Sequence, residues 1–309
     1  MNCLILGGGG FLGYHLCRAL LDAGHTVRIF DRPNIKRFTA APAHAVEWVE
    51  GDLVNHEDLE AAVHGCDVVY HLVSTTLPKS SNDNPIYDIE TNVIGTLHLL
   101  DLARTTRGKK IVFVSSGGTV YGTPGEIPIR ESHPTDPMCS YGITKLVIEK
   151  YLALYHQLYG LDYCVIRPSN PYGERQRITG AQGAVAVFLH KALHNEPIEI
   201  WGDGTVVRDF IYVGDLISAF VKAIAYSGEQ KIFNIGSGQG KSLNELLAAI
   251  ETLLGREVRR IYTPSRAFDV PSNVLDISLA SRYLSWSPET SFHEGLRKTL
   301  TWVAEQKMT

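Results

Sequence analysis

The first half of the chain alternates short apolar runs with amphipathic segments, and this alternation limits the folds that it can adopt. Several runs are apolar throughout, as strands buried on both faces of a parallel sheet are. Between two of them, Leu12, Leu16 and Leu20 repeat at the spacing of an α-helix. The predicted strands are Asn2–Leu6, Thr26–Phe30, Val46–Val49, Val68–Val73, Lys110–Ser115 and Asp162–Arg167, and the predicted helices include His56–His64, Asp88–Arg107 and Ser140–Tyr159. The strand–helix–strand order predicts an α/β fold with a doubly wound parallel sheet.

The rest of the chain has a different texture. After Arg167 it runs through a loop rich in Gly, Pro and Arg, RPSNPYGERQRITGAQG, and later through a second loop, GDGTVVRD. Shorter elements are predicted around these loops: helices near Ala184–His194, Asp215–Ala225, Leu243–Leu254 and Phe292–Glu305, and strands Ile198–Trp201 and Ile232–Ile235. We therefore predict a doubly wound domain over residues 1–170, to which the chain returns around 209–231, and a smaller mixed α/β domain over 171–309.

The first predicted strand runs directly into the sequence GGGGFLG, residues 7–13. Glycines at Gly7, Gly10 and Gly13 suit a tight turn, a close approach of backbone to phosphate, and close packing of helix on strand. The helix that follows would direct its first N–H groups at a pyrophosphate. A glycine triplet also occurs in plain strand-to-helix turns, so the prediction of a dinucleotide site needs further residues.

Asp31 supplies the first of these, because it ends the second predicted strand about 20 residues further on. A carboxylate there can accept hydrogen bonds from both ribose hydroxyls and would repel a 2′-phosphate, which favours NAD over NADP. Arg32 beside it could instead turn towards such a phosphate. Asp52 and Leu53, after the third strand, are candidates for an adenine contact, although Asp52 could simply start the turn into the helix capped by Asn55.

Tyr141 and Lys145 stand four residues apart at the start of a predicted long helix, so they share one face of it. A free phenol has a pKa of about 10 and is a poor base at neutral pH. A nearby ammonium, together with a positive nicotinamide, would stabilise the phenolate. The pair therefore predicts a redox centre, although the same spacing also occurs in ordinary surface pairs.

Composition excludes several other classes of protein. The 309 residues carry a net charge of −4, which argues against a nucleic-acid binder or an anionic-membrane binder. The five cysteines form no CxxC pair, so neither a disulfide framework nor a zinc site is predicted. No apolar run approaches the roughly 18 residues of a membrane span, and the first residues look like a buried strand rather than a signal peptide. We expect a cytoplasmic protein.

Taken in order, the motifs resemble the extended short-chain dehydrogenase/reductase family, in its NAD-dependent sugar epimerase/dehydratase branch. The resemblance covers essentially the whole chain. Besides the glycine turn and Asp31, its carriers are GDL at 51–53, HLVS at 71–74, TNVIGT at 91–96, VFVSSGGTVYG at 112–122, SYGITK at 140–145, RPSNPYG at 167–173 and GDGTVVRDFIYVGD at 202–215.

The resemblance implies a Rossmann-type domain that binds NAD, with Tyr141 as catalytic base and Lys145 on the nicotinamide ribose. It also implies a homodimer, built through a four-helix bundle from Asp88–Arg107 and Ser140–Tyr159. The implied cofactor contacts are Gly7, Gly10, Phe11, Leu12, Asp31, Arg32, Asp52, Leu53, Leu72, Ser74, Asn92, Ser115, Tyr141, Lys145 and Pro168, of which Asn92 could instead be a structural contact.

One position departs from the family pattern. The catalytic Ser or Thr of the family should stand three residues before Val120, where this chain has Gly117. Glycine has no hydroxyl to link Tyr141 with the sugar oxygen. Ser116, Thr119 or a water molecule could substitute, or Gly117 could make room for a bulky substrate group. Positioned proton transfer contributes about 10²–10⁴ in rate, so the loss of such a hydroxyl matters.

The same frame separates reaction types. Where related dehydratases carry an acid/base pair and related decarboxylases a glutamate, this chain has Gly118 and Thr119, so dehydration is disfavoured. The TVYG ending looks more like the UDP-galactose (UDP-glucose) 4-epimerases. Similarity to these implies a UDP-sugar substrate held by Asn170, Trp201, Arg208, Arg266 and Asp269, with Asn273 where a small side chain would admit an N-acetylhexosamine. Trp201 could instead be plain core, and Arg208 could pair with Asp209 on the surface.

Three functions remain open from the sequence. The first is NAD-dependent 4-epimerisation of a UDP-sugar through a transient 4-keto intermediate. The second is a nucleotide-sugar reductase or dehydrogenase that exchanges NAD(P)H freely. The third is a non-catalytic nucleotide-binding module. Gly117 supports this function, and the intact Tyr141 and Lys145 argue against it. No metal site is predicted.

Overall fold

The computed structural model describes residues 1–309 except 36, 39–45, 106–108, 179–182, 266–269 and 307–309. The chain divides into two compact units. Unit 1 comprises Met1–Gly122, Pro134–Arg167 and Ile217–Phe233, and unit 2 comprises Thr123–His133, Pro168–Leu216 and Asn234–Thr309.

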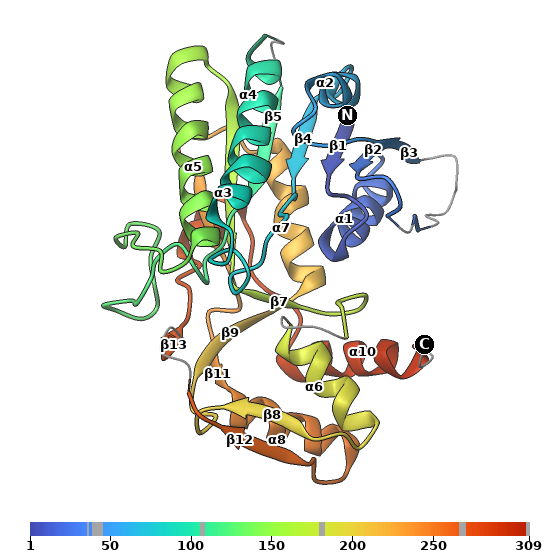
Figure 1. Ribbon diagram of the computed structural model, residues 1–309, viewed down its shortest axis with the longest axis vertical. Coiled ribbons are helices and arrows are strands. Elements are labelled where there is room, and N and C mark those ends of the chain that lie inside the picture. The colour runs from blue at the N-terminus through green and yellow to red at the C-terminus, as the bar shows by residue number, and fades with distance from the viewer. Residues whose placement is uncertain (36, 39–45, 106–108, 179–182, 266–269, 307–309) are drawn as a thin grey trace. The chain divides into compact units, whose positions relative to one another are not determined.

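A seven-stranded sheet organises unit 1 (Figure 1). Its strands are β1 (Asn2–Leu6), β2 (Thr26–Asp31), β3 (Val46–Glu50), β4 (Val68–His71), β5 (Lys110–Val114), β6 (Asp162–Pro168) and β10 (Ile232–Ile235), in the spatial order β10-β6-β5-β4-β1-β2-β3. The ladders from β6 to β3 are parallel. The predicted Rossmann-type doubly wound sheet is confirmed, because the order reverses beside β1.

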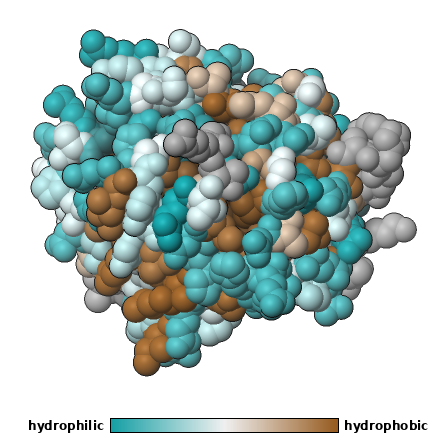
Figure 2. Space-filling view, turned by 90° about the horizontal axis from the view of Figure 1, so that it is seen from above, coloured by the Kyte–Doolittle hydropathy of each residue, from teal (hydrophilic) through white to brown (hydrophobic). Residues whose placement is uncertain are grey.

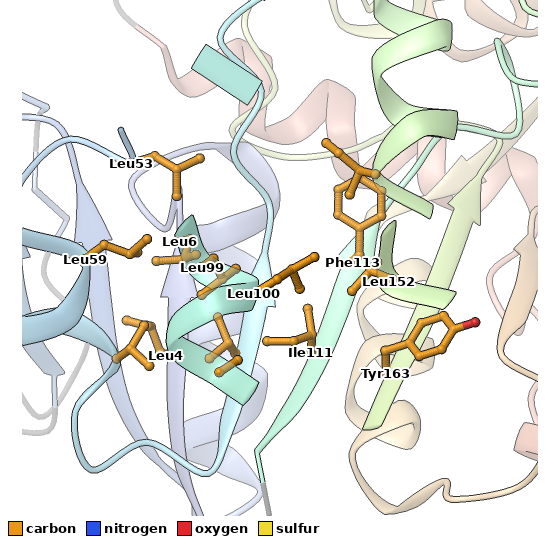
Figure 3. Packing of buried hydrophobic residues seen from close by; sticks show 14 of the residues in the cluster. Leu4, Leu6, Leu53, Leu59, Leu99, Leu100, Ile111, Phe113, Leu152 and Tyr163 are labelled. Atoms are coloured by element: carbon orange, nitrogen blue, oxygen red, sulfur yellow. The ribbon is translucent and has the colours of Figure 1, made fainter. Parts of the chain in front are cut away.

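Helices bury the apolar side chains of this sheet. Leucines 4 and 6 of β1, together with Ile111 and Phe113 of β5, pack under α2 (His56–Val63), α4 (Gly95–Thr105) and α5 (Ser140–Tyr159), as Figure 3 shows for Leu99, Leu100 and Leu152. Tyr70 faces the other way and donates a hydrogen bond of 3.1 Å to the Phe220 carbonyl of α7 (Val213–Ala225). Both faces are therefore covered, which explains why the central strands carry continuous apolar runs.

The predicted helix Asp88–Arg107 is wrong as a single element. The structure has α3 (Pro85–Asp88), a π-helical turn η2 (Ile89–Ile94) and then α4, which ends at Thr105. The break has a local cause, because side chains compete for the backbone carbonyls that a regular helix would use. The Asn92 side-chain amide donates to the Asp88 carbonyl at 2.9 Å, and the Thr96 hydroxyl donates to the Asn92 carbonyl at 2.5 Å.

Other predicted boundaries shift by a few residues. β4 ends at His71 and β5 at Val114, earlier than the predictions of Val73 and Ser115. Ser115 still donates its backbone N–H to the Ile166 carbonyl at 2.8 Å, so the ladder runs one residue beyond the strand. The predictions for α5 and for α10 (Phe292–Glu305) agree with the structure at both ends.

Unit 2 is built from short strands and helices around its own core. Its strands are β7 (Asn170–Tyr172), β8 (Ile198–Trp201), β9 (Val207–Tyr212), β11 (Gly240–Ser242), β12 (Arg260–Thr263) and β13 (Ser272–Asn273), and its helices include α6 (Ala184–Leu193), α8 (Leu243–Leu254), α9 (Ser278–Leu284) and α10. The core gathers Phe188, Leu189, Ile198, Ile200 and Leu247.

Both loops predicted after Arg167 contain strands. β7 lies within RPSNPYGERQRITGAQG, and β9 begins within GDGTVVRD, where it pairs with β7, β11 and β13. These strands were missed because they are two to six residues long and mix polar with apolar residues, so no period stands out.

Among the described residues, no helix is both long enough and apolar enough to cross a lipid bilayer.

Candidate active site

The glycine turn after β1 is shaped by close backbone contacts. Gly7 has a φ of +79°, a conformation that favours glycine. A Cβ on Gly13 would lie 2.4 Å from the Gly8 carbonyl oxygen, so only glycine lets α1 (Phe11–Asp22) begin this close to the turn. Gly10 is the N-cap of α1 and has no side chain to occupy the first N–H groups of the helix. The turn therefore has the form of a phosphate cradle.

Asp31 lies beside this turn, as the sequence predicts. Its carboxylate accepts hydrogen bonds from the backbone N–H of Gly9 at 2.9 Å and of Arg32 at 2.8 Å. Two backbone donors hold the carboxylate at the end of β2, within reach of the glycine turn. Asp31 is only half-buried and Arg32 is exposed. An acidic group next to a phosphate cradle is the arrangement that binds the adenosine ribose of NAD.

Four other predicted cofactor contacts, including the adenine candidates Asp52 and Leu53, lie at the ends of strands or directly after them. Asp52 is exposed, and its carboxylate accepts from the Val54 N–H at 3.2 Å in the turn that leads to the Asn55 cap of α2. Leu53 is buried and belongs to the core cluster. Leu72, directly after β4, is half-buried, and Pro168 is buried at the end of β6.

Tyr141 and Lys145 lie in the first turns of α5. The Lys145 ammonium is 5.6 Å from the centre of the Tyr141 ring and 4.9 Å from that of Phe113. It donates a hydrogen bond of 2.9 Å to the Val114 carbonyl at the end of β5. Lys145 is 4% exposed, which is rare for a lysine. The structure therefore brings the two residues together on one face, at the carboxyl end of a central strand.

Burial controls the ionisation of both groups. It raises the pKa of Tyr141 to about 12, with the charges of Cys139 and Asp88 adding to the rise and a hydrogen bond to Ser74 opposing it. Burial also lowers the pKa of Lys145 to about 8, while Asp88 and Glu149 raise it. The protein groups alone therefore leave the pKa of Tyr141 above its ordinary value, and the expectation that Lys145 and a bound nicotinamide lower it stays a prediction.

The turn that contains Gly117 packs against the start of α5. A Cβ on Gly142 would lie 2.8 Å from the Thr119 carbonyl, so glycine allows this turn to reach the first turn of the helix. Ser116 is half-buried. The Thr119 hydroxyl oxygen is shut off from solvent and has no hydrogen-bond partner in the described part of the chain.

Ser115, predicted to contact the cofactor, is occupied elsewhere. It is 1% exposed, and its hydroxyl donates to the Glu149 carboxylate. Glu149 pairs with Arg167 through contacts of 2.9 Å and 2.5 Å, and Arg167 also donates to the Tyr121 hydroxyl at 2.8 Å. The four side chains form a closed buried network, which fixes α5 one turn beyond Lys145.

Asn92 also belongs to a network rather than standing alone. Its amide donates to Thr75 at 2.8 Å and to the Asp88 carboxylate at 2.9 Å, and its carbonyl oxygen accepts from the Thr75 N–H. Asp88 is fully buried and was missed from the sequence. Its position four residues before Asn92, on one helical face, is the signal that could have indicated it.

Unit 2 holds the predicted substrate residues that the structure describes. Asn170, Arg208 and Asn273 lie on the adjacent strands β7, β9 and β13, with Arg208 directly opposite Asn273. The Asn170 amide donates to the Asp209 carbonyl at 3.0 Å, and Arg208 donates to the Val270 carbonyl at 2.7 Å. The alternative of a surface pair is wrong, because Asp209 is fully buried among Ser169, Ser237 and backbone donors.

Trp201 ends β8 and is half-buried. The residues Ile198 and Ile200 of the same strand are fully buried, so the strand alternation turns Trp201 away from the unit 2 core. Its contact with a planar ligand stays a prediction. Arg266 and Asp269 lie outside the described residues.

The chain is similar to known proteins over nearly all of its length. Residues 3–236 match the model of the NAD dependent epimerase/dehydratase family. The UDP-glucose 4-epimerase of Mycolicibacterium smegmatis is 36% identical over 306 residues, covering 97% of each chain. The structure of UDP-glucose 4-epimerase from Thermotoga maritima with UDP-glucose superposes with a TM-score of 0.93 at 33% identity, and that of the Thermus thermophilus enzyme with NAD with 0.90 at 32%, each over 99% of both chains.

Proposed function

Because the chain belongs to the NAD-dependent epimerase/dehydratase family, and its relatives mark it as an NAD-dependent UDP-sugar 4-epimerase, we propose that it interconverts UDP-glucose and UDP-galactose or their N-acetyl forms. The observation that carries the proposal is the pairing of the half-buried Tyr141 with the buried Lys145, whose ammonium lies 5.6 Å from the centre of the Tyr141 ring. The small side chain of Asn273 supports the inclusion of N-acetylhexosamines.

The residues of unit 1 fit the cofactor. The cradle at Gly7–Gly13 admits no Cβ at Gly13, and Asp31 stands beside it to accept from the ribose. NAD⁺ held by this turn and Asp31 would supply the hydride acceptor and donor for C4 of the sugar. The protein needs to hold this cofactor throughout, since each turnover regenerates it.

Tyr141 takes the proton from the 4-hydroxyl in the first half of the reaction and gives it back in the second. Lys145 holds the nicotinamide ribose, and the hydrogen bond to Ser74 opposes the rise in the pKa of Tyr141 that burial causes. The transient 4-keto sugar then turns before the hydride returns. Asn170, Trp201, Arg208, Arg266 and Asp269 hold the UDP moiety, with arginine forks on the diphosphate and the indole on the uracil.

Two hydroxyls are candidates for the one missing at Gly117. We expect Ser116 to matter more, because it is half-buried, whereas the Thr119 hydroxyl is closed off from solvent. Ser116→Ala should lower kcat by about 10²-fold, the scale of one positioned proton transfer. Thr119→Val, which keeps the shape of the side chain, should change kcat less. A larger loss of kcat in Thr119→Val than in Ser116→Ala would instead assign the proton-transfer role to Thr119.

We also propose that the protein is a homodimer. Apolar side chains are exposed on two neighbouring parts of unit 1, at Ile86 and Ile89 of the α3–η2 segment and at Ile143, Leu154 and Leu158 of α5. Ile86 is 70% and Leu158 58% exposed, which is costly for a single chain in water. Figure 2 shows hydrophobic side chains gathered towards the lower left of the face seen from above. A monomer at micromolar concentration in light scattering would contradict a dimer.

The test of the main proposal is direct. The purified enzyme is incubated with UDP-glucose, UDP-galactose, UDP-N-acetylglucosamine and UDP-N-acetylgalactosamine, and the products are separated by chromatography. We expect interconversion within at least one pair and no net formation of NADH. No interconversion in either pair contradicts the proposal, and stoichiometric release of NADH would instead indicate a dehydrogenase.

A further inference from the structure

Asp88 is a buried carboxylate whose charge is not neutralised by a direct partner. It is 0% exposed at the end of α3. Within the described residues it forms no ion pair with any lysine or arginine. Glu149, on the other side of Lys145 along α5, differs because it is paired with Arg167 at 2.5 Å. A buried charge without an oppositely charged partner is expensive, so its presence calls for a reason.

The two oxygens of the Asp88 carboxylate bind different parts of unit 1. Oδ1 accepts from the Thr76 hydroxyl at 2.5 Å and from the Asn92 amide at 2.9 Å. Oδ2 accepts from the Ser140 hydroxyl at 2.7 Å and from the Thr144 hydroxyl at 3.4 Å. Ser140 and Thr144 are the residues that immediately precede Tyr141 and Lys145. The carboxylate therefore links three parts of unit 1: the segment that follows β4, the π-helical turn η2, and the first turns of α5, which carry Tyr141 and Lys145.

The same segment also caps α5 in place of a local residue. Cys139, the N-cap of α5, provides no side-chain hydrogen bond. The Asn82 side chain accepts from the Ser140 N–H at 2.9 Å, and the Ser81 hydroxyl accepts from the Tyr141 N–H at 3.0 Å. The start of the helix is thus held from a segment about 60 residues earlier, and Asp88 provides the negative charge that a helix N-terminus favours.

We propose that Asp88 is a positioning residue that clips the first turn of α5 in place and, through its bond to Thr144, sets a negative charge next to the buried Lys145. The inference rests on the proposed roles of Tyr141 and Lys145 and adds to them the group that sets their geometry and charge. An asparagine would keep only one acceptor oxygen, because its amide nitrogen donates, so Asp88→Asn removes the charge and also changes the hydrogen bonds at one of the two carboxylate positions.

The charges around the pair decide the sign of the effect. Tyr141 faces Cys139, Asp88, Ser74 and the Lys145 ammonium, and Lys145 faces Asp88, Glu149 and the neutral ring of His71. Removing the negative charge of Asp88 makes it harder to keep Lys145 protonated, so the pKa of Lys145 falls. It also makes the Tyr141 phenolate less unfavourable, so the pKa of Tyr141 falls as well. Both limits of a bell-shaped pH–rate profile move to lower pH.

The experiment compares Asp88→Asn with Glu90→Gln, which removes an exposed carboxylate two residues away. Enzyme labelled with ¹³C at the lysine Cε is titrated by NMR, and the Lys145 signal is assigned by its loss in Lys145→Met. We expect the pKa of Lys145 to fall by about one unit in Asp88→Asn, the size of a charge effect over several Å at a moderate dielectric. Glu90→Gln should leave it unchanged, because solvent screens an exposed charge.

The pH profile of kcat/KM for 4-epimerisation gives the second readout. In Asp88→Asn the whole pH profile should move to lower pH by about the same amount as the pKa of Lys145. Ser140→Ala keeps the charge of Asp88 and loses one hydrogen bond of the clip. This variant should lower kcat several-fold and leave the pH profile where it is. An Asp88→Asn enzyme with an unchanged pKa of Lys145, or an equal shift in Glu90→Gln, overturns the role of the charge. Where Asp88→Asn does not fold, an unchanged kcat in Ser140→Ala overturns the clip.

These outcomes separate this inference from the proposed function. The NMR titration requires no turnover, so it can succeed in an enzyme that interconverts no UDP-sugar. Conversely, the wild-type enzyme could show 4-epimerase activity while Asp88→Asn leaves the pKa of Lys145 unchanged. That result would support the proposed function and contradict the inference about Asp88.

Discussion

Helices α1 and α5 begin in the same way and are completed differently. Neither N-cap residue, Gly10 or Cys139, supplies a side-chain hydrogen bond to the first N–H groups of its helix. At α1, glycines keep side chains away from the helix start, which suits a pyrophosphate. At α5, Ser81 and Asn82 fill the corresponding places, and Asp88 lies beside them. One helix start thus has the form of a binding site, and the other is a fixed support for Tyr141.

The largest effect should come from removing the phenol that α5 supports. Tyr141→Phe loses the base for the 4-hydroxyl proton, and we expect kcat to fall by about 10²–10⁴-fold. The NAD content of the purified protein, measured by chromatography after denaturation, should stay at the wild-type level because the α1 cradle is intact. A wild-type kcat in this variant would show that Tyr141 of α5 is not the catalytic base.

A smaller effect is expected at the α1 cradle. Gly13→Ala places a Cβ within 2.4–2.6 Å of the backbone of Gly8, so the helix must move away from the turn. Overpacking of this kind costs about 1–3 kcal/mol, and we expect a corresponding loss of NAD affinity of roughly 5- to 150-fold by calorimetry.

The matched control is Gly24→Ala, at the other end of α1, where a Cβ meets nothing within 4 Å and only the φ of +80° is unfavourable. It should lower the free energy of unfolding by about 1 kcal/mol and leave NAD affinity unchanged. Equal losses of affinity in the two variants would show that the close approach of helix and turn is not what binds the cofactor.

The smallest effect should come from the cap that α5 receives from a distance. Ser81→Ala removes the acceptor of the Tyr141 N–H, and we expect a loss of about 1 kcal/mol in the free energy of unfolding. Because the lost bond holds Tyr141 itself, kcat should also fall, by about two- to fivefold on the scale of a few tenths to one kcal/mol. Denaturant unfolding and steady-state kinetics measure the two effects.

Ser291→Ala provides the comparison, since the Ser291 hydroxyl caps α10 through the Glu294 N–H at 3.2 Å, in unit 2. It should cost similar stability with no change in kcat. If both variants lower kcat equally, the cap of α5 has no special role.

The contrast between the two helices also explains what the sequence could predict. The α1 cradle depends on a strand, a glycine turn and a helix that follow one another within residues 2–22, so local spacing indicates it. The support of α5 depends on Ser81, Asn82 and Asp88, which lie about 50–60 residues before their partners along the chain. No periodicity reports such contacts, and Asp88 was accordingly missed.

The misreadings have the same origin. A single helix over Asp88–Arg107 follows from periodicity, and the π-helical turn at Ile89–Ile94 depends on side-chain bonds to backbone carbonyls that periodicity does not report. Likewise, the raised pKa of Tyr141 arises from burial, which spacing along a helix does not reveal. The cofactor, the family and the sheet were predicted because each depends on motifs that are local in the sequence.

The most direct test of the account uses UDP-glucose that carries deuterium at C4. The account predicts UDP-galactose that retains the deuterium at C4, with none in the solvent and none at neighbouring carbons, because hydride leaves C4 and returns to it on a cofactor that stays bound. Loss of the deuterium to water, or its appearance at a neighbouring carbon, would contradict 4-epimerisation through Tyr141 and a bound NAD.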